Sequence, residues 1–455
     1  MERRAREEID LLIHGGTVVP MDEAFTVIPE GAVAVNGRDV VAVGPAGELG
    51  ERYEPRERID AAGHVVLPGL VNAHSHSAMT LFRGLADDLS LEAWLTGHIW
   101  PAEASFVDPD TVARGTALAC VEMLEGGVTS CLDMYWYPEA CGEAAREVGL
   151  RHVMGGVMVD FPGADRLTPE GRIAENRSLL ERYREDPLLG VTVQPHSTYA
   201  VSPDLLAACR DLADEYGVRL ALHASETAAE NADVAKRYGR RPVGHLESLG
   251  MLGPRTTLLH GVHLDDGEIA LLAERGVSVV HCLESELKLA SGVPRLPELL
   301  AAGVNVGLGT DGAASNNDLD LWSELRLAAL LFKARGSDPT LVPAREALRL
   351  ATRGSACAAG IDHLVGSLEP GKRADVVLVD FRKPHLRPVY DVYSHLAYSV
   401  GRADVATVLV NGRVVVRDGR VTTVARDDVM ARVDEVAGRI AAADRRRSPV
   451  PGSPA

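Results

Sequence analysis

Two kinds of hydrophobic pattern alternate along the chain. Near each end, apolar and polar residues alternate over short runs, as expected for strands with one buried face. The stretch GAVAVNGRDVVAVG, beginning at Gly31, predicts two strands joined by a type I′ turn at Asn36-Gly37. Near the other end, DVATVLVNGRVVVRDGRV predicts further hairpins at Asn411-Gly412 and Asp418-Gly419. Both ends are therefore expected to be rich in antiparallel β-structure.

The middle of the chain has a different rhythm. Short apolar runs such as LLGVTVQPH, RLALHAS, TTLLHG and VSVVHC are separated by helical patterns such as PDLLAACRDLADEYG and DDGEIALLAERG. Strands that alternate with helices are typical of a parallel sheet, and roughly 300 residues suit an eight-stranded barrel with insertions. We therefore expect an α/β fold, a (β/α)8 TIM barrel with a small β-sandwich domain built from both chain ends.

These patterns also set the expected domain boundaries. Residues 1–67 and 365–424 are expected to form the two parts of the β-sandwich domain, with the barrel at 68–364 between them. Residues 425–455 are expected to form a C-terminal helix, from Asp427 to Arg445, and a disordered tail.

Composition narrows the possible partners. The 455 residues carry a formal net charge of -18, which would repel a phosphate backbone, so no nucleic-acid partner is expected. No apolar run is long enough to span a bilayer, and the first residues, MERRAREEID, lack the apolar core of a signal peptide. The six cysteines form no C-x-x-C pair and are expected to be buried free thiols. We expect a cytoplasmic protein with a small-molecule substrate and no membrane partner.

Polar residues follow several apolar runs of the middle region. Because parallel barrel strands open their carboxyl ends on one face, residues at these ends should converge there. The residues are His74, His76, His196, His223, His260 and Asp311. A lone histidine at such a position is more often a hydrogen-bonded polar residue, and His263 and His281 are assigned to that class. Five strand ends that carry histidine or aspartate favour a functional site instead.

Four of these residues form a nitrogen-rich set with one carboxylate. The set is His74, His76, His223 and Asp311, and it suits Zn²⁺ or Fe²⁺ better than Ca²⁺ or Mg²⁺. No lysine precedes Lys236, so the earlier strands offer none to bridge a second metal when carboxylated. One metal ion per chain is therefore expected. The segment GLGTDG also matches a dinucleotide-binding pattern, but Asp311 inside it would repel phosphates.

The motifs of the chain, in their order, resemble those of the amidohydrolase superfamily, in particular its deaminases of S-adenosylhomocysteine and methylthioadenosine. The resemblance rests on LPGLVNAHSHSAMTLFRGLADDLSLEAWL, PHSTY, LHASET, LLHGVHL and GVNVGLGTDGAASNNDLD. It implies that the four-residue set binds the metal and that Glu226 and His260 act as acid and base together with Asp311. It further implies that Glu92 holds ribose hydroxyls, that His196 and Arg172 contact the substrate outside its ring, and that the chain forms homo-oligomers.

The expected function is metal-dependent hydrolytic deamination of 5′-modified adenosines. The candidates are methylthioadenosine, 5′-deoxyadenosine and S-adenosylhomocysteine, each giving ammonia and the inosine product. The alternative is an aminohydrolase or chlorohydrolase of another heteroaromatic ring, such as a triazine, a pterin or another purine. A non-catalytic scaffold is disfavoured because such relatives are expected to lose metal ligands.

One segment departs from the family pattern. In HCLESELKLASG, Leu283 stands where proline is usual and Glu286 where asparagine is usual. Two interpretations remain open: Glu286 faces the pocket and disfavours an anionic 5′ substituent, or it turns outward or pairs with an arginine. In addition, Gly155 and Gly156 lie where some relatives place an arginine for the substrate carboxylate. Together these features predict a preference for 5′ substituents that lack a carboxylate.

Overall fold

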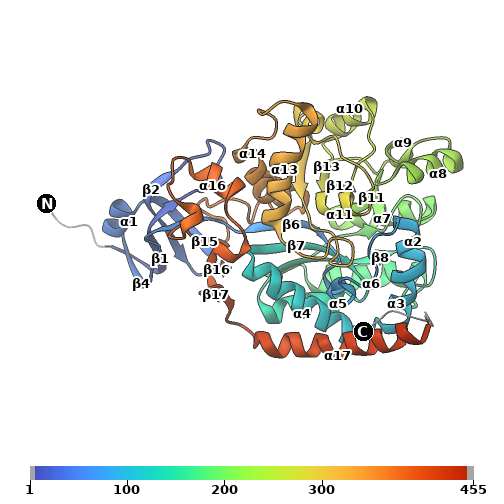
Figure 1. Ribbon diagram of the computed structural model, residues 1–455, viewed down its shortest axis with the longest axis horizontal. Coiled ribbons are helices and arrows are strands. Elements are labelled where there is room, and N and C mark those ends of the chain that lie inside the picture. Colours follow the sequence, from blue (N-terminus) through green and yellow to red (C-terminus); the bar gives the residue numbers. More distant parts are fainter. Residues whose placement is uncertain (1–5, 448–455) are drawn as a thin grey trace, which may run out of the picture.

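The computed structural model describes residues 6–447. It has a β-rich part built from both ends of the chain and a larger part in which strands and helices alternate (Figure 1). The first part lies at the left of Figure 1 and the second at the right.

Strands from both chain ends share one nine-stranded sheet. Its strands are β1 (Glu7–Val18), β2 (Ile28–Asn36), β3 (Asp39–Pro45), β4 (Tyr53–Asp60), β5 (His64–Pro68), β15 (Val376–Asp380), β16 (Val405–Val410), β17 (Arg413–Arg417) and β18 (Arg420–Val421). The two ends meet where β15 pairs antiparallel with β5. Apolar residues from both ends, including Ile13 and Val376, share one buried cluster.

The hairpin turns have the predicted type near the C-terminal end of the chain but not near the N-terminal end. Asn411-Gly412 and Asp418-Gly419 have positive φ at both residues, as a type I′ turn requires. At Asn36-Gly37 only Gly37 has positive φ, 58°, so the predicted type I′ turn is wrong there. The backbone N–H of Gly37 instead donates to Asp10 Oδ2 at 2.7 Å, a partner on β1 that no local pattern reveals.

The middle of the chain forms two sheets of parallel strands, which confirms the α/β class. The first has the order β10-β8-β7-β6 with β9 beside β8, and the second has the order β11-β12-β13-β14. The strands are β6 (Leu70–Ser75), β7 (Val128–Tyr135), β8 (Arg151–Met158), β9 (Leu189–Val191), β10 (Gln194–Pro195), β11 (Leu220–Ala224), β12 (Thr256–His260), β13 (Ser278–His281) and β14 (Asn305–Leu308). The single strand predicted over LLGVTVQPH is wrong, because β9 and β10 are separate short strands.

Backbone contacts join the two parallel sheets at both of their edges. Parallel bridges pair Ser197 with His223 and Val193 with Leu220. At the other edge, Thr310 and Asp311 follow β14, and their N–H groups donate to the carbonyl oxygen of His74 on β6 at 3.1 and 3.0 Å. β6, β7 and β8 are buried along their whole length, as expected for parallel strands covered on both faces.

Helices follow most of the parallel strands and begin at recognisable capping residues. Asp108 caps α4, Thr168 caps α6 and Ser202 caps α7, each followed by proline at the first helical position. The helices are α1 (Ala46–Arg52), α2 (Leu91–Trp94), α3 (Trp100–Phe106), α4 (Pro109–Glu125), α5 (Pro138–Val148), α6 (Pro169–Arg182), α7 (Pro203–Tyr216), α8 (Ala228–Tyr238), α9 (Pro242–Ser248), α10 (Asp266–Arg275), α11 (Leu283–Lys288), α12 (Leu296–Ala301), α13 (Leu321–Gly336), α14 (Ala344–Arg349), α15 (Ser355–Ala358), α16 (Val392–Tyr398) and α17 (Arg426–Arg447).

Short 3₁₀-helical and π-helical segments complete the fold. They are η1 (Ser77–Phe82), η2 (Leu95–Ile99), η3 (Leu350–Gly354), η4 (Pro384–Leu386) and η5 (Arg402–Asp404). Along the chain, η1 and η2 lie between β6, which carries the first predicted histidine ligand, and α3.

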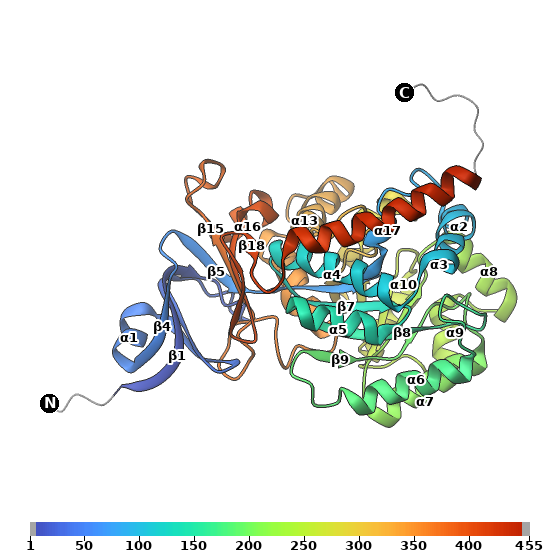
Figure 2. The same ribbon diagram turned by 90° about the horizontal axis from the view of Figure 1, so that it is seen from below.

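The expected C-terminal helix is confirmed as α17, which runs along α4 (Figure 2). Its residues Val433, Val436 and Ile440 are buried against the parallel-strand part. The predicted disordered tail lies outside the described residues from 448 onward. Within residues 6–447, no helix is long and apolar enough to cross a membrane. All six cysteines are free, and every one except the half-buried Cys357 is buried, as predicted.

Candidate active site

The first two histidines of the predicted ligand set lie beside its aspartate. His74 lies near the end of β6, and His76 follows that strand directly. His74 Nε2 is 3.5 Å and His76 Nε2 is 3.3 Å from Asp311 Oδ1. Although burial opposes ionisation of Asp311, its contacts with His74 and His76 hold the pKa of this carboxyl well below its ordinary range. A carboxylate is therefore available as a ligand.

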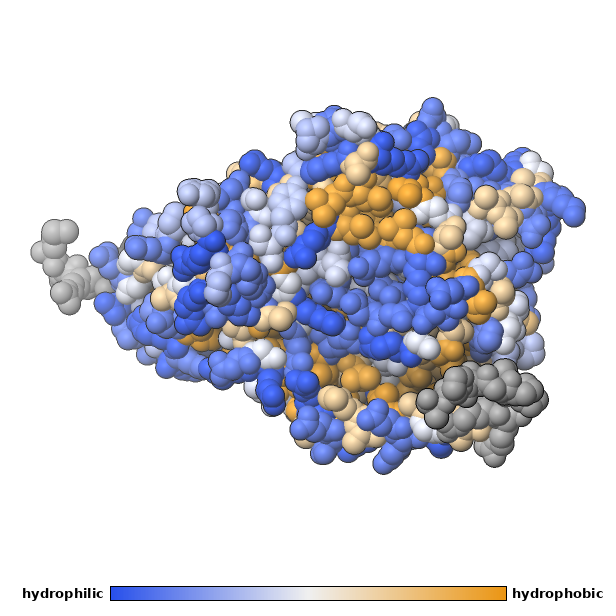
Figure 3. All heavy atoms as spheres, viewed as in Figure 1, coloured by the Kyte–Doolittle hydropathy of each residue, from blue (hydrophilic) through white to orange (hydrophobic). Residues whose placement is uncertain are grey.

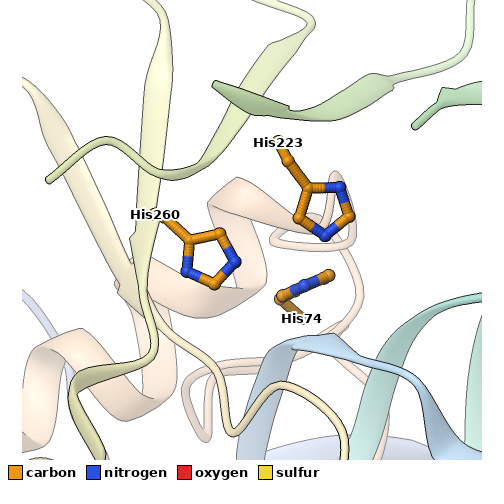
Figure 4. Close-up of side chains that lie close together, drawn as sticks. All are labelled: His74, His223 and His260. Carbon is orange, nitrogen blue, oxygen red and sulfur yellow. The ribbon is translucent and has the colours of Figure 1, made fainter. Parts of the chain in front are cut away.

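Two further histidines complete the cluster from the neighbouring sheet. His223 on β11 and His260 at the end of β12 lie beside His74 (Figure 4). One ligand atom from each of these three lies within 4.8 Å of the others, and the same holds for His74, His76 and Asp311. Burial lowers the pKa of His74 to about 4 and holds that of His223 well below its usual value. The rings are therefore neutral, as metal ligands must be.

The hydrogen bonds of these histidines fit a bound cation. His76 Nδ1 lies 2.6 Å from the Met134 carbonyl oxygen, and His223 Nδ1 lies 2.6 Å from the His196 carbonyl oxygen. These bonds assign the proton to Nδ1 and leave Nε2 as a lone-pair donor. Both ring nitrogens of His74 are buried without a hydrogen-bond partner. A buried orphan nitrogen is costly, and a metal ion would satisfy one.

The backbone around Asp311 is strained in a way that aims its side chain. Asp311 has φ of 60° and His260 has φ of 69°, both in the left-handed region that non-glycine residues avoid. Asp311 Oδ2 accepts hydrogen bonds from the hydroxyls of Ser285 and Ser315, each at 2.7 Å. These two bonds hold one oxygen and leave Oδ1 directed at the histidines.

Glu226 lines the same cavity as His223 and His260. It follows β11 by two residues and is 5% exposed. Burial raises the pKa of Glu226 to about 7, so the group is suited to proton transfer at neutral pH. Its backbone N–H donates to Glu230 Oε2 at 2.8 Å, and Glu230 Oε1 accepts from Thr198 Oγ1 at 2.7 Å. This chain of bonds fixes the turn that carries Glu226.

The cavity has a polar inner end and an apolar outer wall. The ligand cluster, Glu226 and His196 lie at the inner end. The outer wall is built by aromatic and aliphatic side chains from α2, η2, α3 and the ends of β7 and β8, among them Trp94, Trp100, Trp136, Val159 and Phe161. Glu103 on α3 also lines the cavity and is only 4% exposed. Burial raises the pKa of Glu103.

Glu103 is a candidate that our interpretation of the sequence missed. Glu92 was chosen from SLEAWL, but its side chain is exposed and is not among the residues that line the cavity. Its neighbours Leu91 and Trp94 on the same helix do line it. The signal that could have identified Glu103 is WPAEASF, where a glutamate lies inside an apolar run.

Of the two other predicted substrate contacts, one reaches the cavity. His196 lines it, and burial lowers the pKa of His196 to about 3. Arg172 on α6 does not line it, so this geometry does not support the direct substrate contact that the sequence predicted. Its guanidinium is paired with Asp165, with Nη2 2.7 Å from Oδ1 and Nε 3.1 Å from Oδ2.

The segment that departs from the family pattern lies behind the cavity wall. Glu286 is fully buried, with Oε1 3.4 Å from His260 Nδ1 and accepting from the Cys282 N–H at 2.9 Å. It neither lines the cavity nor turns outward nor pairs with an arginine, so both interpretations of Glu286 are wrong. The backbone N–H of Leu283, which proline would lack, donates to the buried Glu324 Oε2 at 2.8 Å.

Comparisons with known proteins agree with this site. The model of the Amidohydrolase family matches residues 65–415, and the chain belongs to this family. A 5-methylthioadenosine/S-adenosylhomocysteine deaminase from Syntrophobacter fumaroxidans is 48% identical over 431 residues, covering 95% of this chain and 98% of that protein. A protein of the same name, numbered 1, from Syntrophus aciditrophicus is 44% identical over 434 residues, covering 95% and 98%. The family resemblance expected from the sequence is thereby confirmed.

Solved structures match the whole fold. An adenosine deaminase from Xanthomonas campestris with bound zinc has a TM-score of 0.94 and 41% identity, covering 96% of this chain and 100% of that one. An atrazine chlorohydrolase from Arthrobacter aurescens complexed with zinc has a TM-score of 0.87 and 27% identity, covering 94% and 100%. Together with the histidine cluster, these comparisons support metal-dependent chemistry at this site.

Proposed function

We propose that the protein is a metal-dependent hydrolytic deaminase of 5′-modified adenosines, releasing ammonia and the corresponding inosine. The observation that carries this proposal is the cavity that joins the histidine cluster, Glu226 and Glu103. The names of the relatives from Syntrophobacter fumaroxidans and Syntrophus aciditrophicus support the same activity.

A single Zn²⁺ or Fe²⁺ per chain fits the donor set. We propose His74, His76, His223 and Asp311 as its ligands, because His74 lies within reach of His76 and Asp311 on one side and of His223 on the other, and the set offers imidazole nitrogens and one carboxylate. Such an ion, when bound, supplies a Lewis acid that makes water nucleophilic near neutral pH. His260 lies beside the ligands and is left for proton transfer.

The side chains of the site then divide the proton transfers. Glu226, with a pKa raised to about 7, donates a proton to a ring nitrogen and makes the adjacent carbon electrophilic. Asp311 accepts the proton of the attacking water, and His260 orients that water by a hydrogen bond. Water adds at the carbon that bears the amino group, and ammonia leaves after a proton returns to it. His196 contacts the substrate beside this centre.

Recognition of the ribose is assigned to Glu103 in place of Glu92. A buried carboxylate can accept hydrogen bonds from two adjacent hydroxyls, and Glu103 lies in the cavity wall where Glu92 does not. Arg172 acts on the substrate only through the loop that it holds, since its N–H groups also donate to the carbonyl oxygens of Val159 and Phe161.

The experiment that tests this function compares leaving groups on two kinds of ring. The zinc-loaded protein is assayed for ammonia release from methylthioadenosine and for chloride release from atrazine. We expect turnover of methylthioadenosine and none of atrazine. Turnover of the triazine alone would overturn the proposal in favour of a chlorohydrolase, the activity named for the Arthrobacter aurescens structure.

The finer architecture is also a proposal. The bridges and backbone bonds between the parallel sheets support a closed (β/α)8 barrel over residues 68–364, with a β-sandwich domain formed by 1–67 and 365–424.

We further propose a cytoplasmic homo-oligomer. An apolar surface over α13 and α11 supports the oligomer (Figure 3). Leu330 on α13 and Leu287 on α11 are exposed. A solution mass of 48.6 kDa by light scattering would contradict it.

A further inference from the structure

The outer end of the cavity is aromatic and lacks a cation. Three tryptophans, Trp94, Trp100 and Trp136, line it together with Phe161. The ring centroids of Trp100 and Phe161 lie 5.7 Å apart with the planes tilted by 55°, so the two rings form one wall. No lysine or arginine is found among the described residues that line the cavity. Its ionisable groups other than histidine and tyrosine are the carboxyls of Glu103, Glu226 and Asp311.

The guanidinium of Arg172 lies beside this wall, but its N–H groups are already bonded to other protein groups. The Arg172 guanidinium carbon is 5.7 Å from the centroid of the Trp136 ring. Its N–H groups donate to both Asp165 oxygens and, at 2.9 and 3.2 Å, to the carbonyl oxygens of Val159 and Phe161. The side chains of Arg172 and Asp165 are 2% and 6% exposed. The pair is therefore a buried structural ion pair, and breaking it would leave a buried charge alone.

The loop held by this pair packs directly on the wall. A Cβ added at Gly163 would lie 2.2 Å from the Trp136 ring, so the loop backbone touches the indole. Tyr137 also donates from its hydroxyl to the carbonyl oxygen of Ala164 at 3.0 Å. The loop has little freedom to release Arg172 toward a ligand.

We propose that this wall selects adenosines whose 5′ substituent is uncharged and apolar, an inference that rests on the proposed function. A methylthio group or a 5′-methyl group would contact the aromatic rings, and sulfur makes favourable contacts with ring edges. The amino-acid group of S-adenosylhomocysteine would instead bring a carboxylate and an ammonium out of water. The carboxylate would find no cation, because the guanidinium of Arg172 is already paired with Asp165. An unpaired charge against an apolar wall costs free energy.

The first test measures kcat/KM of the zinc-loaded enzyme for methylthioadenosine, 5′-deoxyadenosine and S-adenosylhomocysteine. We expect the first two to exceed the third by at least about tenfold, since a site that leaves a polar group unpaired rejects it strongly. A value for S-adenosylhomocysteine equal to or above the others would overturn the inference while the deaminase function stands. Deamination of none of the three would instead refute the proposed function, and the inference with it.

The second test places a cation in the wall. Phe161 is 38% exposed at the rim, so Phe161→Arg can be accommodated without repacking the core. Phe161→Met is the matched control, because it removes the ring but adds no charge. We expect the ratio of kcat/KM for S-adenosylhomocysteine to that for methylthioadenosine to rise at least about tenfold in Phe161→Arg relative to Phe161→Met. Equal ratios in the two variants would show that the 5′ substituent does not reach this wall.

Discussion

The inner and outer ends of the cavity are built in different ways. At the inner end, each functional side chain lies on or just beyond a parallel strand, as His74 does on β6 and His223 on β11. At the outer end, the wall comes largely from short helical segments and a loop, as Trp94 does on α2 and Phe161 beyond β8. The strands fix where a side chain points, whereas a short helix presents several residues to different sides.

This difference separates chemistry from selectivity. The inner end holds the clustered histidines and the carboxyls to which we assign proton transfer, and the carbonyl oxygens of Met134 and His196 orient two of these rings. The outer end holds apolar surface whose shape can change without moving those groups. Substitutions at the inner end should therefore reduce turnover of every substrate, and substitutions at the outer end should change which substrate is used.

The largest effect is expected from removing a ligand at the inner end. His223→Ala should lose bound metal and reduce kcat/KM for methylthioadenosine. The reduction should exceed the roughly 10–100-fold loss that follows when a residue that only supports a metal ligand is replaced. His263→Ala is the control, because His263 Nε2 bonds the Ser291 carbonyl oxygen and His263 does not line the cavity. Elemental analysis and kinetics check both. A His223→Ala enzyme with full metal content would remove His223 from the ligand set.

The next largest effect concerns the proton donor. Glu226→Gln keeps the shape of the side chain but has no proton to give, so kcat should fall by roughly 10²–10⁴-fold. The metal content should stay at the parent level, because Glu226 is not in the ligand set. Retention of kcat within an order of magnitude would show that another group supplies the proton.

The same contrast explains what the sequence could predict. The inner site was predicted because polar residues at the ends of apolar runs must converge in a parallel sheet, and His74, His223 and Asp311 do converge. Glu92 lies on a helix of four residues, which is too short for periodicity to tell its faces apart, and the structure places its side chain at the surface and outside the cavity. The partners of Glu286 and Arg172 could not be predicted from the sequence either, because they depend on how loops pack and not on any local pattern.

A smaller effect should distinguish Glu92 on α2 from Glu103 on α3. Glu103→Gln should raise KM for methylthioadenosine by roughly 10–100-fold, the loss expected for hydrogen bonds to a charged group. KM for free adenine, which lacks ribose, should stay unchanged. Glu92→Gln is the matched control and should leave both KM values within twofold, about the spread of a surface substitution. An increase for Glu92→Gln alone would return the ribose-binding role to Glu92.

The smallest effect should come from Glu286, which lies behind the inner end of the cavity and contacts His260. Glu286 lies 3.4 Å from His260 Nδ1 and outside the cavity, so it acts on the reaction only by holding the ring with its other nitrogen toward the site. Glu286→Gln keeps an acceptor oxygen but loses the charge, and kcat should fall by roughly tenfold, as expected when an outer-shell partner is weakened. KM and metal content should not change, since no substrate or ligand contact is removed. Glu284→Gln, on the same helix but away from His260, should leave kcat unchanged. A rise in KM without a fall in kcat would place Glu286 with the outer end of the cavity, as a determinant of selectivity.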